Sequence, residues 1–330
     1  MTALRALISF CVMAPLIWAL NSSAGVAQAR YPERPIRVII PFPPGGVYDS
    51  VGRPLAERLR LHLGQVVIEN LAGAGGTRGA AMAVRAQPDG YTLFLGGTGA
   101  LVITPLASRR PLYDPLIDFE PISRLAVVGL SISVHPSIPA RDLKAMLSYT
   151  RANSGQLTFG SSGTGTLNHL TVELFKKLAG TPSVPHVPHS GAGALLNDVV
   201  GGHIPLAVVN VTGNVLALHR EGKIRLLAVT NAERLDGAPD IPTTAEAGFP
   251  ELDALVFAGL FAPKGTPRAI IDQIAEATKK ALADHDLQAI YLASGFITDR
   301  NSNPEKMGEF LRAELKKWKP LLEEIGFKLE

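Results

Sequence analysis

The feature that most constrains the fold is an alternation of short apolar runs with stretches of helical periodicity. The apolar runs are rich in β-branched residues, and we expect strands at residues 36–42, 66–69, 92–96, 157–160, 204–209 and 224–229. Helical patterns lie between them, near residues 49–63, 77–87, 142–153, 166–179, 190–200 and 213–220. The alternation predicts an α/β fold with βαβ units, in which mainly parallel sheets are flanked by helices.

Two long irregular regions interrupt this rhythm, and each contains a long apolar strand. One strand is the run LAVVGLSISV before His135, and the other covers residues 254–262. Two such strands predict a chain that crosses to a second lobe and returns. We therefore expect a discontinuous first α/β lobe and an inserted second one. The predicted first lobe comprises residues 30–124 and 252–330, and the second comprises residues 125–251.

Two further helices are predicted near the end of the chain, because each has a clear start signal. Thr266-Pro267 precedes one apolar helical pattern, and Asn303-Pro304 precedes the other. Pro320 lies inside the second pattern, and we expect it to kink that helix or end it early.

The first 29 residues have the organisation of a secretory signal peptide. Arg5 precedes an apolar run, and Ala27-Gln28-Ala29 has the small-x-small pattern of a cleavage site. The run is short for a bilayer span, so cleavage after Ala29 is favoured over an uncleaved anchor. A periplasmic location follows from this prediction.

Cysteine usage and charge exclude several function classes. The one cysteine, Cys11, lies in the predicted signal peptide, so the mature chain would carry no disulfide, thiolate metal site or cysteine nucleophile. The 32 Lys and Arg residues and 29 Asp and Glu residues are scattered, and no basic face interleaved with aromatic residues is present. Nucleic acid is therefore not an expected partner.

Three glycine-rich loops follow predicted strands and open predicted helices. They read PFPPGGVYD at residues 41–49, GAGGTRG at 73–79 and GSSGTGT at 160–166. Glycine lets the backbone approach a ligand closely, and a helix N-terminus offers free N–H groups with about half a positive charge. Each loop is a candidate cradle for a carboxylate or phosphate, although a glycine that merely turns the chain is an equally open interpretation.

Each of three enzyme motifs is partly matched by these loops, but a residue that the motif requires is missing in every case. GAGGTRG departs from dinucleotide-binding spacing, with Arg78 where the last glycine belongs. GSSGTGT has Thr166 where a phosphate-binding P-loop needs lysine. Ser162 follows Gly160 as in a nucleophile elbow, but Thr164 replaces the second glycine. None of these patterns predicts catalysis.

Three histidines are candidates either for ligand or metal binding or for ordinary structural roles. His186 and His189 could bind a metal, but an ordinary hydrogen-bonding role in a pocket wall is favoured because no carboxylate neighbours them in sequence. His169 falls in the first turn of a predicted helix, where it either reaches a cleft or caps the helix. Asp49 and Asp198 are interpreted as helix-start or solvated carboxylates.

A resemblance to a known family extends over essentially the whole mature chain. Its successive blocks read PERPIRVIIPFPPGG, VVIENLAGAGG, PDGYTL, YDPLIDFEPIS, GSSGTGTLNHL, GKIRLLAVT, PDIPTTAEAGFPE and FAPKGTP. In these blocks the chain resembles the Bug-type extracytoplasmic receptors of the tripartite tricarboxylate transporter family. The resemblance implies a two-domain periplasmic binding protein, a type II-like Venus flytrap. It also implies a small carboxylate held by backbone N–H groups, hydroxyls and waters.

The resemblance carries a set of ligand-binding positions onto this sequence, in the first and third glycine-rich loops and at a few positions outside them. These positions are Phe42, Pro43, Gly45, Gly46, Val47, Asp49, Thr98, Ser161, Thr164, Gly165, Thr166, His169, His189 and Asn210. Two of them depart from the family pattern. His189 replaces a usual tyrosine, and Asn210 stands where aspartate is common, so we expect an altered specificity.

The predicted function is capture of a small carboxylated ligand in an interdomain cleft, for uptake or sensing. The ligand class implied is a di- or tricarboxylate, an amino acid or an aromatic acid. A membrane permease of the tripartite tricarboxylate type is a further expected partner, and we expect a monomer without a cofactor. The alternative is a periplasmic hydrolase acting on a small acid or ester, which would need a nucleophile paired with a base.

Overall fold

β4 (Phe119–Val134) is the strand that connects the whole sheet in the computed structural model, which describes residues 31–235, 237–324 and 326–329. The sheet has the order β2-β1-β3-β9-β4-β7-β5-β6, and β8 and β10 also pair with β4. All these strands belong to one compact unit, Arg34–Glu330. The predicted signal peptide and its cleavage site after Ala29 lie outside the described residues.

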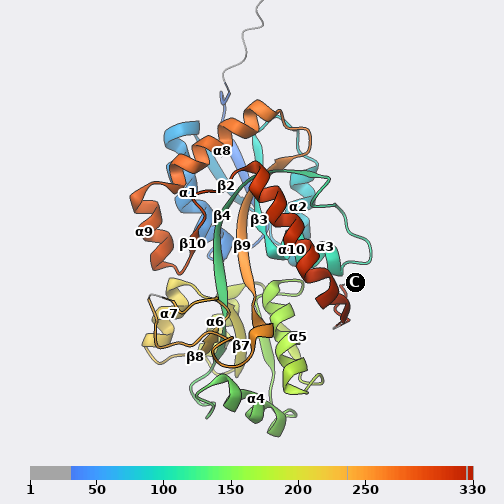
Figure 1. The fold of residues 1–330 in the computed structure, drawn as a ribbon, viewed down its shortest axis with the longest axis vertical. Helices are drawn as coiled ribbons and strands as arrows, with labels where there is room; N and C mark the ends of the chain where they lie inside the picture. The colour runs from blue at the N-terminus through green and yellow to red at the C-terminus, as the bar shows by residue number, and fades with distance from the viewer. Residues whose placement is uncertain (1–30, 236, 325, 330) are drawn as a thin grey trace, which may run out of the picture. The chain divides into compact units, whose positions relative to one another are not determined.

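The strands fall into two groups that meet on β4 (Figure 1). The first half-sheet contains residues 119–129 of β4, and the second contains residues 130–134. The first group is β1 (Ile36–Ile40), β2 (Val66–Asn70), β3 (Thr92–Gly97), β9 (Leu255–Pro263) and β10 (Ile297–Thr298). The second group is β5 (Phe159–Ser161), β6 (His186–Pro188), β7 (Leu206–Asn210) and β8 (Arg225–Val229).

Strand directions confirm part of the prediction. The outer strands of each half-sheet run parallel, as expected for βαβ units: β1 pairs with β2 and β3, and β5 pairs with β6 and β7. β4 and β9 instead pair antiparallel over most of their length. β4 continues as an antiparallel neighbour of β7 and β8. The sheet is therefore mixed, because the chain passes between the half-sheets once in each direction.

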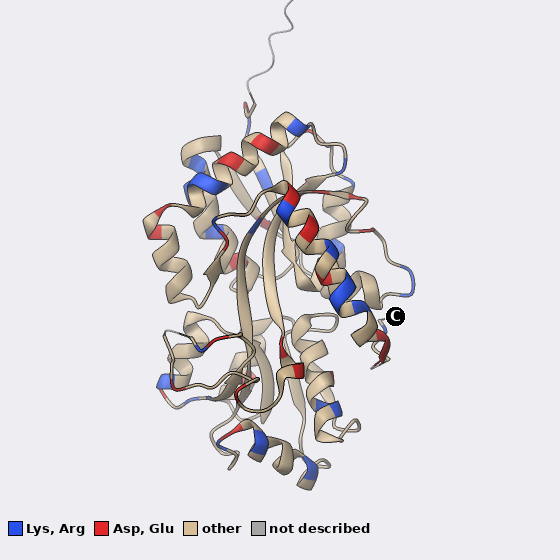
Figure 2. Cartoon of the chain, viewed as in Figure 1, with Lys and Arg blue, Asp and Glu red and all other residues tan. Residues whose placement is uncertain are grey.

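Helices flank both half-sheets, and the six that were predicted with bounds lie close to them. They are α1 (Val47–Leu63), α2 (Thr77–Val84), α3 (Thr104–Ala107), α4 (Leu143–Ala152), α5 (Leu167–Ala179), α6 (Ala192–Val200), α7 (Gly213–Arg220), α8 (Arg268–Leu282), α9 (His285–Ala293) and α10 (Pro304–Glu324). Within α1, Val51, Leu55 and Leu59 recur at helical spacing and are buried. Figure 2 shows the positions of charged residues along the ribbon, mainly on helices and loops, with both signs along α10.

Several short elements escaped the sequence analysis. A π-helix (Gly99–Ile103) runs into α3, and α9 and β10 follow α8. Two 3₁₀ turns, Ala74–Gly76 and Pro250–Leu252, were also not predicted. These pieces are too short, or too uniformly apolar, to show a periodic pattern of their own.

The prediction for Pro320 was wrong in one respect, because α10 continues through it to Glu324. Pro320 and Lys316 are both exposed. The Lys316 carbonyl, which loses its helical N–H partner at Pro320, can therefore bind water instead. None of the helices in the described part of the chain has the length and apolar character that crossing a membrane requires.

Candidate functional site

A small cavity of about 160 Å³ lies between the two half-sheets. Its walls come from the loop and first turn at the start of α1, from the first turns of α5 and α6, and from single residues of other elements. The lining residues are Phe42, Pro43, Pro44, Gly46, Val47, Tyr48, Gly99, Ser162, Thr166, Leu167, Asn168, Ser190, Gly191, Ala192, Gly193, Ala194, Asn210 and Val256. Among these described residues there is no charged side chain.

A large cavity of about 1180 Å³ adjoins the small one and shares Phe42, Pro43, Ser162, Thr166 and Ser190 with it. Its remaining walls come from the second glycine-rich loop, from the segment after α3 and from the C-terminal residues. They are Ala72, Gly73, Ala74, Gly75, Gly76, Thr77, Thr104, Pro105, Ser108, Arg109, Arg110, Pro111, Leu112, Tyr113, Gly163, Thr164, Pro188, His189, Lys328 and Leu329. Basic side chains therefore line the large cavity, and none lines the small one.

The loop before α1 is held in shape by Asp49. The Asp49 carboxylate accepts hydrogen bonds from the Gly45 N–H at 2.9 Å, Arg53 Nε at 2.9 Å and Asn70 Nδ2 at 3.0 Å. Asn70 Nδ2 also donates to the Phe42 carbonyl at 3.0 Å. Burial alone would raise the pKa of Asp49, but these three donors together lower it. The carboxylate therefore organises the loop and does not line either cavity.

The same loop leads into α1, whose N-terminus lies at the small cavity and has no side-chain cap. Gly46 is the N-cap of α1 in an extended conformation, and no side chain accepts a hydrogen bond from the first turn there. Phe42 stacks on Tyr48 with ring centroids 4.9 Å apart, which fixes the cavity wall beside that turn. Gly45 has a φ of 80°, a left-handed conformation that favours glycine.

The loop before α5 is organised by Thr166. Its hydroxyl caps the helix by accepting from the His169 N–H at 3.3 Å, and it donates to the Gly163 carbonyl at 2.7 Å. The Gly165 N–H donates to His169 Nδ1 at 3.3 Å. Thr164 lines the large cavity. The first turn of α5 therefore reaches both cavities through Thr166, while His169 supports the loop from below.

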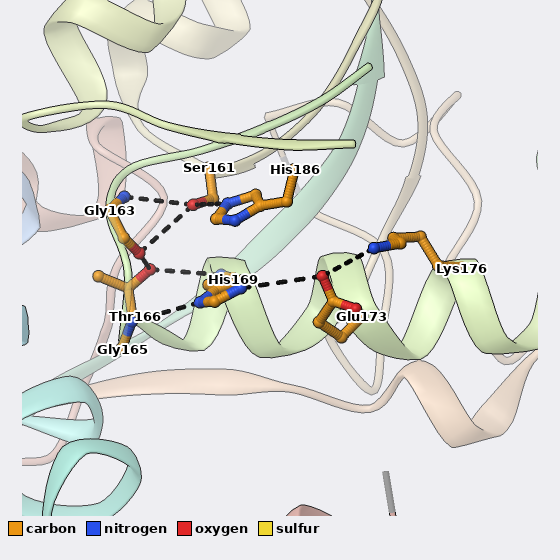
Figure 3. A network of polar contacts seen from close by, with 8 residues as sticks. All are labelled: Ser161, Gly163, Gly165, Thr166, His169, Glu173, Lys176 and His186. Carbon is orange, nitrogen blue, oxygen red and sulfur yellow. Dashed lines mark hydrogen bonds and ion pairs between the residues drawn. The ribbon is translucent and has the colours of Figure 1, made fainter. Parts of the chain in front are cut away.

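A polar network lies beneath this loop (Figure 3). Ser161 Oγ and His186 Nε2 are hydrogen bonded at 2.7 Å, and the His186 ring stacks on His169 with centroids 3.9 Å apart. Burial is the main cause that lowers the pKa of His169 to about 3, and the charges of His186 and Lys176 add to it. Burial likewise lowers the pKa of His186 to about 4, together with Lys176 and His189. Both rings are therefore neutral at pH 7.

The network brings three possible metal ligands together, His169, Glu173 and His186, with ligand atoms within 4.8 Å of one another. The two rings are nearly parallel, at 10°, so their in-plane lone pairs do not converge on one centre. Lys176 Nζ already pairs with Glu173 Oε1 at 3.1 Å. This arrangement fits a network whose polar groups pair with one another better than it fits a metal centre.

Ser161 and His186 also form a hydroxyl–imidazole pair that sequence reasoning did not foresee. A nucleophile must reach its substrate, but Ser161 is fully buried and lines neither cavity. Its hydroxyl also contacts both the N–H and the carbonyl of Gly163. The pair is thus part of the loop's internal scaffold.

His189 lies in the wall of the large cavity, with both ring nitrogens engaged by the protein. Nε2 lies 2.9 Å from Asp198 Oδ2, and Nδ1 lies 3.1 Å from the Val187 carbonyl. Two protein acceptors therefore hold the ring in the wall of the cavity. Asp198 was interpreted as a helix-start or solvated carboxylate. It lies near the end of α6 rather than at a helix start, and its side chain is 46% exposed while it pairs with His189.

Thr98 and Asn210 occupy contrasting positions. Thr98 is fully buried, and its hydroxyl accepts from the Phe257 N–H at 3.0 Å, so it ties the end of β3 to β9 rather than lining a cavity. Asn210 ends β7 and lines the small cavity. Its Oδ1 lies 3.4 Å from Asn168 Nδ2.

The predicted positions therefore divide into three groups. Those lining the small cavity are Phe42, Pro43, Gly46, Val47, Thr166 and Asn210. Those lining only the large cavity are Thr164 and His189. Those lining neither are Gly45, Asp49, Thr98, Ser161, Gly165 and His169.

The sequence analysis missed one complete wall of the small cavity, Ser190–Ala194 at the start of α6. Gly191 is the N-cap of α6, again without a side-chain cap. The signal was present in the run SGAGA, a further glycine-containing segment between a strand and a helix. Ser162, Asn168 and Tyr48 also line the cavity and were not among the predicted positions.

Comparison with known proteins places this chain in a family. Residues 51–327 match the tripartite tricarboxylate transporter family receptor. Protein BugT of Bordetella pertussis is 33% identical over 310 residues, which cover 93% of this chain and 94% of BugT.

Solved structures agree with this match. The periplasmic binding protein BugD superposes with a TM-score of 0.86 at 31% identity, covering 91% of this chain and all of BugD. MatC of Rhodopseudomonas palustris, solved with bound malate, superposes with a TM-score of 0.84 at 29% identity, covering 88% of this chain and all of MatC. These likenesses confirm the predicted fold class, a periplasmic binding protein of the α/β type, and give no support to the hydrolase alternative. The chain is a solute-binding protein that belongs to the receptor family of the tripartite tricarboxylate transporters.

Proposed function

We propose that this receptor captures a small carboxylate in the small cavity. The observation that carries the proposal is the meeting of three helix N-termini, those of α1, α5 and α6, around a cavity without a charged side chain. Each N-terminus presents backbone N–H groups and about half a positive charge, which favours an anion. A volume of about 160 Å³ suits a small organic acid rather than a larger molecule.

The two uncapped helices are the strongest candidates for carboxylate contact. Gly46 and Gly191 supply no side-chain acceptor for the first turns of α1 and α6. Both first turns line the cavity, so their N–H groups are available to a ligand. The malate in MatC supports a carboxylate ligand, since that relative is similar over most of both chains.

Closure of two lobes around the ligand is part of this proposal. The lobes would be residues 30–124 with 252–330, and residues 125–251, and the chain would bend in β4 and β9. Contacts between the half-sheets at the cavities support it. Thr104 Oγ1 lies 3.2 Å from the Gly165 carbonyl, and the Phe327 ring lies 4.7 Å from the His169 ring.

The same proposal covers the protein's place in the cell. We propose export to the periplasm, with cleavage after Ala29, and delivery of the ligand as a monomer to a membrane permease of the tripartite type or to a sensor. The receptor family and the periplasmic relatives support this role. We further propose that the protein has no catalytic activity. The burial of Ser161, the hydroxyl that meets a histidine, supports that view.

A calorimetric and melting-temperature screen of the mature protein tests the proposal. Malate and other small mono-, di- and tricarboxylates are the probes. We expect at least one acid to raise the melting temperature and to bind with one-to-one stoichiometry, without turnover. Absence of any binding across the acids would refute carboxylate capture.

Ser190→Ala locates the bound acid. Ser190 is exposed and lines both cavities, and its hydroxyl has no hydrogen-bond partner among the described residues, so we expect its removal to leave the fold intact. A hydrogen bond to a charged group contributes about 1.5–3 kcal/mol, and we therefore expect binding to weaken roughly ten-fold or more. Ser183→Ala, at an exposed serine outside both cavities, is the matched control. Equal affinities of the two variants would place the ligand elsewhere.

A further inference from the structure

Asn210 is the one residue of the small cavity that carries a buried, unsatisfied hydrogen-bond donor within the described part of the chain. It is 7% exposed, and its side-chain Nδ2 has no hydrogen-bond partner there. A buried donor without a partner costs free energy in the folded protein. Because Asn210 lines the cavity, a molecule bound there is the partner within its reach.

The orientation of the Asn210 amide is set by its neighbours. The Val208 carbonyl can only accept, and Asn168 Nδ2 lies 3.2 Å from it, so this atom of Asn168 is the donor. Asn168 Oδ1 accordingly accepts from Ser162 Oγ at 3.0 Å. Asn168 Nδ2 also faces Asn210 at 3.4 Å, which requires the oxygen of Asn210 on that side. The remaining group of Asn210 is its N–H₂ donor.

The rest of the small cavity also offers hydrogen-bond donors and partial positive charge rather than negatively charged side chains. Helix N-termini and hydroxyls provide its polar groups, and no Asp or Glu side chain lines it among the described residues. Asp49 is close in sequence to the cavity wall, but its carboxylate is taken by Arg53, Asn70 and the Gly45 N–H. A ligand ammonium group would therefore meet donors and positive helix ends, without a compensating carboxylate.

We infer that Asn210 determines specificity by donating to an acceptor oxygen of the ligand. The substrate class is then a carboxylic acid with a second oxygen acceptor, such as a hydroxyl, keto or carboxylate oxygen, and without an amino group. This inference rests on the proposed carboxylate capture and narrows its ligand class. Among the acids, amino acids and aromatic acids that the family resemblance left open, it excludes the amino acids.

The inference is tested with pairs of acids that share a carbon skeleton and differ only in carrying a hydroxyl or keto oxygen, or an amino group, at one carbon. The probes are malate, oxaloacetate and aspartate on a four-carbon skeleton, 2-oxoglutarate and glutamate on five carbons, and lactate and alanine on three. Calorimetry should give an affinity for an oxygen-bearing acid at least ten-fold above that of its amino counterpart. An amino acid that binds as tightly as its partner acid would overturn the inference and leave carboxylate capture intact. If no pair binds but another acid of the screen does, the inference fails and carboxylate capture stands; if no acid binds at all, carboxylate capture itself fails.

Asn210→Asp provides the second arm. The new carboxylate repels an acid at this position and can pair with an ammonium group, so the ratio of acid to amino-acid affinity should fall at least ten-fold. Asn197→Asp adds the same charge on an exposed residue of α6 outside both cavities and should leave the ratio unchanged. An unchanged ratio in Asn210→Asp, with the protein folded, contradicts the role of Asn210. The wild-type comparison does not depend on this variant.

Discussion

His169 and His186 are a stacked, buried pair under the loop that reaches both cavities. Folding lowers the pKa of His169 to about 3 and that of His186 to about 4, mainly through burial. An unfolded histidine titrates near pH 6.5, so the unfolded chain binds protons first as the pH falls. The stabilising contribution of the neutral pair is therefore present above about pH 6.5 and is lost toward pH 4 and below.

We expect His169→Phe to reduce this acid sensitivity. Between about pH 6.5 and pH 4, each histidine lowers the free energy of unfolding by up to about 1.4 kcal/mol per pH unit. Phenylalanine keeps a planar ring against His186 but cannot titrate, so the slope should be shallower than in the wild type. Denaturant titrations at several pH values measure it. His285→Gln, with a side chain 97% exposed, should keep the wild-type slope. A His169→Phe slope as steep as the wild-type slope would contradict the assignment.

Which residues line a cavity was only partly predictable from sequence. The glycine-rich loops contain Gly46, Val47 and Thr166, which line the small cavity. Sequence could not show that Asp49 turns back onto Arg53, because that depends on how the loop folds around the helix start. Likewise, the pairing of His189 with Asp198 joins residues of different elements and has no pattern along the chain.

At the scale of elements, Gly129 marks the point where β4 changes partners. It pairs with Leu255 of β9, and the next residue, Leu130, pairs with Asn210 of β7. A Cβ on Gly129 would lie 1.7 Å from Asn231 Oδ1, so an alanine cannot fit without moving Asn231. The close approach of Asn231 therefore depends on glycine at this junction.

We expect Gly129→Ala to destabilise the protein by about 1–3 kcal/mol, as overpacking of a buried site does. Thermal and denaturant unfolding measure the loss. Gly155→Ala is the matched control, because a Cβ there meets nothing within 4 Å. Adding Asn231→Ala to Gly129→Ala removes the clashing atoms and should recover part of the loss. Equal stability of the two single variants would show that the junction adapts freely.

Most elements were predictable because each has its own periodicity or start signal. The short strands, the helices that follow them and the Asn303 start of α10 belong to this class, and Asn303 Oδ1 indeed accepts from the Lys306 N–H at 2.8 Å. The antiparallel pairing of β4 with β9 was not predictable, since it joins residues about 140 positions apart, as in Phe119 with Pro263. Nothing local in either strand specifies its neighbour.

At the scale of the whole molecule, positive charge lines the large cavity, and the small cavity next to it is uncharged among the described residues. Arg109, Arg110 and Lys328 line the large cavity, where no acidic side chain lies among the described residues. The small cavity beside it has no charged lining. Basic residues near a binding site raise the encounter rate with anions, whereas short-range hydrogen-bond donors mainly affect the dissociation rate.

We therefore expect the double variant, Arg109→Gln with Arg110→Gln, to slow the association of an acid ligand several-fold at low salt. The dissociation rate of that ligand should change little. The difference from wild type should shrink as ionic strength rises and the Debye length falls from about 30 Å at 0.01 M to about 10 Å at 0.1 M. Stopped-flow kinetics across that range measure both rates. Arg141→Gln with Lys144→Gln removes the same charge from exposed residues outside both cavities and should leave association nearly unchanged. If both double variants slow association equally, the net charge of the protein rather than the basic lining of the large cavity steers the ligand.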